Sequence, residues 1–371
     1  MRMYYLRLSK ELRFLLLAIV VFTSVSYSTI FHLAFGQVKT IEPTTYLEKE
    51  FLANLDTSLK LKTEMLIRLE NIPRWQWTSA SGDARQYVNN AEELSTAIPP
   101  FQYRVFVPGL VYILRTFLPF DTHRTFALLN FAFLLATATL YTMFLRYALK
   151  LEQPLSLIGG ILSLTILSHT RTGAYPLVDP ATNFFALLVF MAAYSGAAVP
   201  FLIASVLGVA TKEILLFATP LWLATQIHFA TLTWRRAVFH TSVAAVPLMV
   251  FIVLRLSQGG PALDVNYGFD LLNGELPSYA HKRLTQWSAF FFFVKGITLY
   301  AFGPLWLGVL NVRRNPFLFR ATVTVPVVWT ATFFFSGRVE RVQGVLFPIV
   351  ITLFLFFFTL RPKPQESKKL S

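Results

Sequence analysis

The stretch FLLLAIVVFTSVSYSTIFHLAF, from Phe14 to Phe35, runs for about 22 residues without a charged side chain. At about 1.5 Å of rise per residue, a helix of that length crosses a hydrocarbon core about 30 Å thick. Basic residues precede it, at Arg2, Arg7, Lys10 and Arg13. Because basic residues stay on the cytoplasmic side, we predict a first span that leads from a cytoplasmic amino terminus to Gln37 outside. The run is longer than a signal-peptide h-region and no small-residue cleavage site stands out, which disfavours a cleavable signal.

The whole chain has the composition of an integral membrane protein. Hydrophobic residues make up 55% of the 371 residues and charged residues only 14%, and the mean hydropathy is +0.54. The formal net charge is +14, but the basic residues gather at the ends of apolar runs. There they fix topology and meet anionic headgroups, so we expect membrane lipids as partners and no nucleic acid. The absence of cysteine excludes disulfides, thiolate metal sites and cysteine nucleophiles.

The apolar runs predict an all-α integral membrane protein with about ten transmembrane helices. After the first, the predicted spans are Phe126–Tyr147, Pro154–Ser168, Ala181–Val199, Phe201–Ala210, Ile214–Thr231, Ala237–Leu254, Trp287–Leu310, Phe317–Phe335 and Val345–Leu360. Counted alternately inward and outward, they leave the basic clusters in the cytoplasm, at Arg146, Lys150, Arg235, Arg236, Arg313, Arg314 and Arg320. We therefore predict a multi-pass protein of the cell membrane, with one polytopic domain over residues 1–360 and a short basic cytoplasmic tail over residues 361–371.

The longest polar stretch, residues 37–104, becomes the first outer loop. Its hydrophobic residues recur near helical spacing from Leu47 to Leu69, which predicts amphipathic juxtamembrane helices on the outer surface. The next segment, Val105–Phe120, is apolar but short and carries Arg115. We predict an interfacial helix over residues 105–120, because counting this segment as a crossing would move every later basic cluster outside.

Several ionisable residues fall on the predicted outer face. Asp83 lies in the first outer loop, Asp179 opens a span just before Pro180, and Lys212 and Glu213 follow a span that is short for a crossing. A charged group at the mouth of a membrane bundle is held there against a desolvation penalty. These residues are therefore candidates for an active site that faces outside.

The order of these motifs resembles that of a known enzyme family. Asp83-Ala84-Arg85-Gln86-Tyr87, followed by Pro99-Pro100-Phe101-Gln102-Tyr103-Arg104, is similar to the Asp-Glu-x-x-Tyr and Pro-Pro-Leu elements of protein O-mannosyltransferases and bacterial aminoarabinose (lipid A) transferases. These are GT-C glycosyltransferases. Similar blocks follow in order, at Leu177-Val178-Asp179-Pro180, at Gly208-Val209-Ala210-Thr211-Lys212 and from Ser336-Gly337-Arg338 through Glu340-Arg341 to Pro348. The resemblance rests on the order, spacing and sidedness of blocks within residues 80–350.

The resemblance implies a polytopic GT-C-like fold and a specific reaction. Such enzymes pass a sugar, with inversion, from a polyprenyl-phosphate donor to an acceptor hydroxyl outside the cytoplasm. It implies catalytic roles for Asp83, as the base that takes the acceptor proton, and for Asp179. It also implies that cations receive the leaving phosphate, at Lys212, Arg338 and Arg341. The remaining implied substrate-binding residues are Arg85, Tyr87, Tyr103, Arg104 and Glu213. No cofactor or metal is expected, which agrees with a chain that has no glycine-rich phosphate loop.

Asp83 and Asp179 can also be explained by helix capping alone, without a catalytic role. Ser81-Gly82-Asp83 before a helix-compatible stretch is good N-cap chemistry, and Asp179 before Pro180 is a natural helix start. The chain also departs from the family pattern: about 47 residues separate Phe35 from Asp83, and Ala84 stands where the family often has a second acid. The base assignment survives these departures, whereas the identity of the substrate stays open.

The cations have alternatives too. Lys212 and Glu213 can neutralise each other. Arg104 can bind a headgroup, or pair with Glu92 or Glu93. Arg338 and Arg341 can act as topology signals or lipid anchors.

Two other functions fit the same bulk features. A transporter or flippase of lipid-linked sugars would use outer cations to hold a phosphate without chemistry, although no internal repeat supports it. A polysaccharide polymerase or ligase is an enzyme alternative, and we would expect it to use outer Arg and His rather than an acid in the first loop.

Overall fold

A computed structural model describes residues 83–92, 101–169, 177–227, 232–257, 278–295, 305, 315–335 and 344–358. Within these ranges the chain forms helices joined by short turns, and no strand. This confirms the all-helical prediction for the described part. The predicted first span, the outer loop before residue 83 and the basic tail lie outside the described residues.

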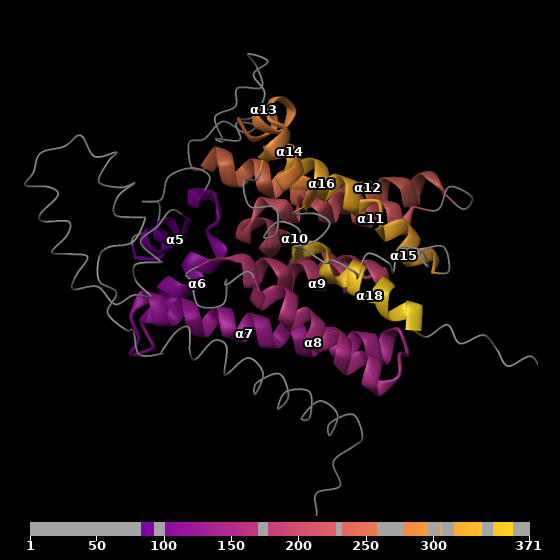
Figure 1. Ribbon diagram of the computed structural model, residues 1–371, viewed down its shortest axis with the longest axis horizontal. Coiled ribbons are helices and arrows are strands. Elements are labelled where there is room, and N and C mark those ends of the chain that lie inside the picture. Colours follow the sequence, from indigo (N-terminus) through magenta and orange to yellow (C-terminus); the bar gives the residue numbers. More distant parts are fainter. Residues whose placement is uncertain are drawn as a thin grey trace, which may run out of the picture.

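Helices α7 and α8 form one side of the bundle and run antiparallel (Figure 1). α7, Thr122–Met143, begins after Asp121, whose Oδ1 accepts a hydrogen bond from the Arg124 backbone N–H at 2.7 Å. Such an N-cap satisfies one of the amides that the first helical turn leaves without a partner. α7 continues into a π-helical turn, Phe144–Ala148, and α8 follows at Gln153–His169. The two helices lie close together partly because α8 carries Gly159, which faces Leu145 of that turn.

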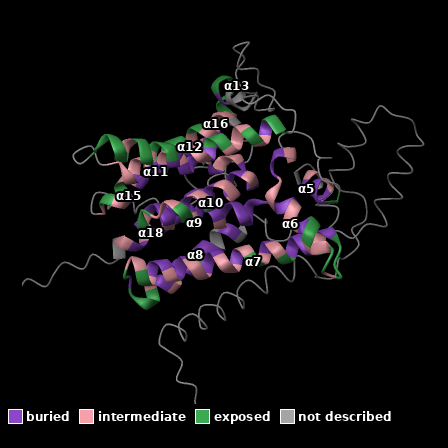
Figure 2. Ribbon diagram, turned by 180° about the vertical axis from the view of Figure 1, so that it is seen from behind, coloured by how far each residue is buried: buried purple, intermediate pink, exposed green. Residues whose placement is uncertain are grey.

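Helix α9, Asp179–Ser195, occupies the middle of the bundle, and most of its residues are buried (Figure 2). It ends at Gly196, whose φ of 69° is the left-handed conformation that favours glycine at a helix end. The chain then reverses into α10, Ala198–Thr211, which packs along α9. A 3₁₀-helix, Glu213–Phe217, and α11, Ala218–Gln226, follow.

Helices α12 to α16 cover the other side of the bundle, whereas α18 lies between the two sides (Figure 1). α12 packs on α10 and α11, and α18 packs on α8 and α9. The α12 residues that face outward include Trp234, Phe239, Met249 and Val253, so this helix presents an apolar surface. The bounds of these helices are α12 Trp234–Ser257, α13 Ser278–Thr285, α14 Trp287–Lys295, α15 Pro316–Ala321, α16 Thr324–Phe335 and α18 Phe347–Phe358.

Three described helical segments are long and apolar enough to cross a membrane: Thr122–Ala148, Trp234–Ser257 and Pro316–Phe334. This supports the assignment to membrane proteins. We predicted about ten spans, and the structure shows three segments of sufficient length among the described residues. Other predicted spans coincide with shorter helices, such as α8 and α10.

The bounds of several predicted spans were wrong. The predicted span Ile214–Thr231 is broken into a 3₁₀-helix and α11. Phe201–Ala210 extends in both directions as α10. The predicted span Phe317–Phe335, in contrast, agrees with the long apolar segment Pro316–Phe334, which contains a turn between α15 and α16. Hydropathy averages over such breaks because it does not depend on the backbone angles of a single residue.

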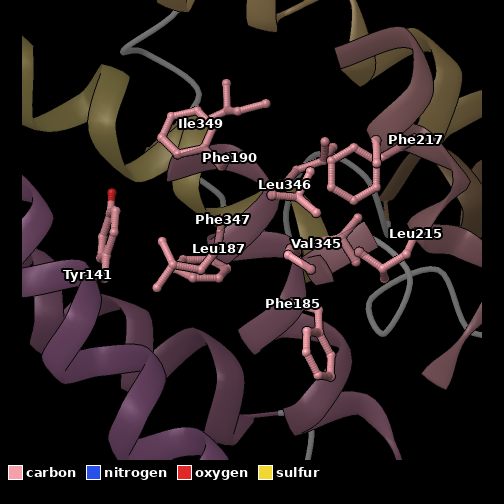
Figure 3. Close-up of a cluster of buried hydrophobic side chains, with 14 of the residues drawn as sticks. Tyr141, Phe185, Leu187, Phe190, Leu215, Phe217, Val345, Leu346, Phe347 and Ile349 are labelled. Atoms are coloured by element: carbon pink, nitrogen blue, oxygen red, sulfur yellow. The ribbon is translucent and has the colours of Figure 1, made fainter. Parts of the chain in front are cut away.

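The core joins segments that are far apart in the sequence. Figure 3 shows Tyr141 of α7, Phe185, Leu187 and Phe190 of α9, and Leu215 and Phe217 of the 3₁₀-helix around the 3₁₀ turn Gly344–Leu346 and the start of α18. The Tyr141 hydroxyl and the Thr352 hydroxyl lie 2.9 Å apart, so the phenolic oxygen has a polar partner inside the apolar core. The buried start of α18 thereby fixes α7 and α9 relative to each other.

Two short helices lie at one end of the bundle, where α9 begins and α10 ends (Figure 1). They are α5, Asp83–Glu92, and α6, Phe106–Arg115, joined through a 3₁₀ turn at Phe101–Tyr103. α6 covers most of the first two thirds of the predicted interfacial helix over residues 105–120. The opposite end holds the α7 and α9 carboxyl ends, where the Tyr194 hydroxyl donates to the Ala148 carbonyl at 3.3 Å.

Gly159 tests the close packing of α8. A Cβ added there would overlap the Cδ1 of Leu145 and lie 2.8 Å from the Cδ1 of Leu355, whereas one at Gly109 in α6 would meet nothing within 4 Å. We expect Gly159→Leu to lower the free energy of unfolding by about 1–3 kcal/mol through overpacking. The matched change Gly109→Leu should be neutral or stabilising, because leucine favours a helix over glycine by roughly 1 kcal/mol. Thermal melts followed by tryptophan fluorescence in detergent compare them, and equal shifts would contradict the packing.

Candidate functional site

Four charged side chains meet at the end of the bundle that carries α5 and α6. They are Arg104, Asp179, Lys212 and Glu213, and we call them the charged cluster. Arg104 follows the 3₁₀ turn after α5, Asp179 is the first residue of α9, and the other two occupy the break between α10 and the 3₁₀-helix. All four are among the predicted site residues, so the fold brings together groups that the sequence placed on the same outer face.

Asp179 and Lys212 form a buried ion pair. Lys212 Nζ donates to Asp179 Oδ1 at 2.6 Å, and the two residues are only 7% and 3% exposed. α9 can begin at Asp179 because Pro180, in its first turn, has no backbone N–H that would need an acceptor. The backbone of Lys212 is extended, with φ −163° and ψ 132°, so α10 stops there and the lysine side chain reaches across to α9. Both charges have lost water, and each depends on the other.

Arg104 holds Glu213 through both carboxylate oxygens. Its Nε donates to Glu213 Oε2 at 2.9 Å and its Nη2 donates to Oε1. Its Nη1 donates to the Tyr87 hydroxyl, and its guanidinium carbon lies 5.1 Å from the Phe101 ring centroid. A planar guanidinium suits this two-pronged contact and aromatic contact at the same time. The arginine therefore fastens α5 and the following turn to the α10 break.

The electrostatics of Glu213 follow from this contact. Glu213 is the first residue of the 3₁₀-helix after α10 and lies outside the three long apolar segments. Burial alone would raise its pKa, but the charge and hydrogen bonds of Arg104 outweigh burial and lower the pKa to about 2. Lys212 adds to the lowering. Glu213 is therefore a carboxylate at every physiological pH, and it serves as a fixed negative partner rather than as a proton carrier.

The partners differ from the alternatives that the sequence suggested. Lys212 contacts Asp179, and the carboxylate of Glu213 is bound by Arg104, so the two neighbours do not simply neutralise each other. The suggested pairing of Arg104 with Glu92 was wrong, because Glu92 accepts a hydrogen bond from the Thr122 hydroxyl at 2.7 Å. The reason is geometric: α5 turns Glu92 toward α7, while Tyr87 faces Arg104.

Other predicted site residues are placed only in part. Asp83 is the first residue of α5, as the helix-start interpretation expects, and residues four apart share a helix face, so its position lies on the face of Tyr87. The side chains of Asp83 and Arg85 fall outside the described part. Arg338 and Arg341 also lie outside it.

The segment that follows Arg338 and Arg341 reaches the end of the bundle that holds the charged cluster. A Cβ on Gly344 would lie 2.9 Å from Asn183 Oδ1, one turn after Asp179 in α9. The described chain therefore resumes beside α9 directly after the predicted Arg338 and Arg341.

Sequence reasoning missed Arg255. This residue lies in the last turn of α12 and is 1% exposed, with its guanidinium carbon 4.8 Å from the Tyr103 ring centroid. Tyr103, a predicted substrate-binding residue, directly precedes Arg104, so Arg255 borders the charged cluster. A signal was present, because Arg255 follows the predicted span Ala237–Leu254 at its outer end, where the charge rule does not call for a basic residue.

The buried pair of α9 and α10 makes a first prediction. Lys212→Met leaves the Asp179 carboxylate buried without its partner, so we expect a loss of about 3–5 kcal/mol in the free energy of unfolding. Combining it with Asp179→Leu replaces the pair by apolar side chains and should restore most of that loss. The control is Lys212→Met with Glu213→Gln. If stability recovers in the control but not in the first double variant, Lys212 pairs with Glu213 and not with Asp179.

Glu213 makes a prediction about pH. Because folding lowers its pKa, its charged form stabilises the protein fully above the ordinary value of 4.5, and this contribution disappears as the pH falls through about 2. Glu213→Gln should therefore melt below wild type at pH 7, and the two melting temperatures should converge between pH 4.5 and 2. Melts at steps across that window measure the difference. A gap that stays constant would show that the charge of Glu213 adds nothing to stability.

Comparison of the chain with protein-family models, with curated proteins and with solved structures finds no match. The resemblance to GT-C glycosyltransferases therefore rests on the sequence blocks themselves. A function has to be argued from the charged cluster and from its place at the end of an apolar bundle.

Proposed function

We propose that this protein is a membrane glycosyltransferase that moves a sugar from a polyprenyl-phosphate donor to an acceptor hydroxyl on the non-cytoplasmic face, with inversion. The observation that carries the proposal is the charged cluster at one end of an apolar bundle. Its Asp179–Lys212 pair is buried, and its Arg104 is buried against a Glu213 side chain that is 25% exposed. Ion pairs are a poor way to stabilise such a bundle, since apolar residues of the same volume do as well or better. Their presence there favours a chemical role.

The chemistry of the reaction needs what the cluster contains. As the bond to the sugar breaks, negative charge develops on the lipid phosphate, and fixed cations stabilise it best where water is scarce. Lys212 and Arg104 are such cations, each already oriented by a carboxylate. The exposed apolar side chains of the bundle also suit a donor with an isoprenoid tail.

The base comes from the same end of the bundle. An acceptor hydroxyl is a weak nucleophile, so a carboxylate must take its proton as the new bond forms. Asp179 and Glu213 are each engaged by a cation. Asp83, on the Tyr87 face of α5, is the acid that we assign as base, and Asp179 then positions Lys212.

A transfer assay tests this function. The purified protein in liposomes receives a synthetic polyprenyl-phosphate hexose, with envelope extract of its own cell as the source of acceptors, and mass spectrometry measures released polyprenyl phosphate. Release that requires the protein supports the enzyme. Donor that reaches the opposite leaflet with its phosphate–sugar bond intact supports the flippase alternative instead.

The role of Asp83 gives a sharper prediction. Asp83→Asn keeps the size and helix-capping ability of the side chain but removes the base, so we expect transfer to fall by about 10²- to 10⁴-fold with little change in melting temperature. The matched control is Asp121→Asn, at an exposed N-cap of α7 that asparagine also fills, and it should keep full activity. Near-normal turnover of the Asp83 variant would reduce Asp83 to a cap.

A further inference from the structure

Asn183 is a buried amide in the second turn of α9. It is 4% exposed and lies four residues after Asp179, so the two side chains share one face of the helix. The polar residues around it have partners: Asp179 binds Lys212, and the Thr182 hydroxyl donates to the Val178 carbonyl at 2.8 Å. Within the described part of the chain, no hydrogen bond joins the Asn183 amide to another residue. A buried amide in that position needs an explanation.

The residue that faces this amide is Gly344, in the 3₁₀ turn before α18. A Cβ on Gly344 would lie 2.9 Å from Asn183 Oδ1 and 3.4 Å from Asn183 Nδ2. Among the described glycines, Gly196 is the one with a positive φ, so the backbone conformation does not require glycine at position 344. The absence of a side chain is what matters there. It allows the turn to approach α9 closely while the amide keeps the orientation that the structure shows.

An amide suits one class of ligand particularly well. Its carbonyl oxygen accepts hydrogen bonds and its NH₂ group donates them, so it can bind a hydroxyl group in either sense, or two neighbouring hydroxyls at once. It carries no charge, and it therefore complements the ionic groups of the charged cluster rather than repeating them. A few polar groups placed among apolar walls are what orients a ligand and selects it. In a polyprenyl-phosphate donor, the hydroxyl groups belong to the sugar.

We infer that Asn183 and Gly344 form a subsite for the sugar of the donor, in which the Asn183 amide binds a sugar hydroxyl and Gly344 leaves the amide free to do so. The sugar is bonded directly to the phosphate, which we place at Lys212, and Lys212 binds Asp179. Four residues of helix correspond to about 6 Å of axial rise, so the next turn of α9 is within reach of that sugar. The identity of the ligand rests on the proposed function, whereas sugar binding can be measured without any transfer reaction.

Binding measurements on the purified full-length protein test the inference with defined probes. Native mass spectrometry compares polyprenyl-phosphate mannose, glucose and aminoarabinose with polyprenyl methyl phosphate, which keeps the phosphodiester and has no sugar. We expect wild type to prefer at least one sugar-bearing lipid to the methyl ester. Asn183→Leu removes the amide at similar volume, so it should reduce this preference by about 5- to 30-fold, as expected for one or two neutral hydrogen bonds. Affinity for the methyl ester should not change.

Gly344→Ala tests the same subsite without changing Asn183. The new methyl group would press on the end of the amide side chain, which can turn away at little cost to stability. We therefore expect most of the sugar preference to be lost with a small change in melting temperature. In the Asn183→Leu background, Gly344→Ala should cause no further loss of that preference, because the two changes act on one contact.

Two variants at other places in the bundle are matched controls. Gln226→Met removes an amide whose Nε2 donates to the Ala193 carbonyl at 2.6 Å, at the opposite end of the bundle. Gly159→Ala places a Cβ against Leu145. Both should lower stability and leave the sugar preference unchanged. If Asn183→Leu and Gly344→Ala behave in the same way, the amide is structural and the inference is wrong.

The two proposals fail in different ways. A sugar preference that depends on Asn183, in a protein that releases no polyprenyl phosphate and transfers no sugar, overturns the glycosyltransferase and keeps the subsite. Sugar transfer by Asn183→Leu with wild-type KM and the wild-type choice of donor sugar overturns the subsite and keeps the enzyme. A wild-type protein that binds none of the three sugar-bearing lipids better than the methyl ester also overturns the subsite.

Discussion

The desolvation of charge inside an apolar bundle is the constraint on which this structure depends. Arg104, Asp179, Lys212 and Glu213 are tolerated only because each meets an opposite charge at hydrogen-bonding distance. To make those contacts, α9 has to begin at Asp179 and α10 has to stop at Lys212. The break after α10 is therefore a requirement of the ion pairs. It explains why an apolar stretch that could form one long helix is divided.

The Arg104–Glu213 pair also decides how α5 is attached to the bundle. Tyr87 in α5 and Glu213 beyond α10 share the guanidinium of Arg104, so one side chain links α5, the turn Phe101–Tyr103 and the centre of the bundle. Because the contact is bidentate, it fixes orientation as well as distance. Any ligand that competes for Arg104 or Lys212 must therefore also disturb the anchoring of α5 or the start of α9.

The sequence predicted the class of fold and the membership of the cluster better than its pairing. The apolar run of α7 and the Asp179-Pro180 helix start were readable because periodicity and capping chemistry act locally. The partner of Arg104 could not be predicted, because Glu213 is 109 residues away in the sequence. The choice between Glu213 and Glu92 depends on how α5 packs. Arg255 was missed for a related reason: hydropathy shows where a helix ends but not which way its last side chain turns.

The long sequence separation within the Arg104–Glu213 pair has a consequence for biogenesis. A chain made at about 5–20 residues per second reaches Glu213 roughly 5–20 seconds after Arg104, given their separation of 109 residues. Throughout that interval Arg104 has been made but its acid has not, and α9 and α10 are incomplete. The final position of α5 is then set late, after the helices that come behind it. A truncated chain that stops before the α10 break would leave Arg104 without the carboxylate that it binds in the folded protein.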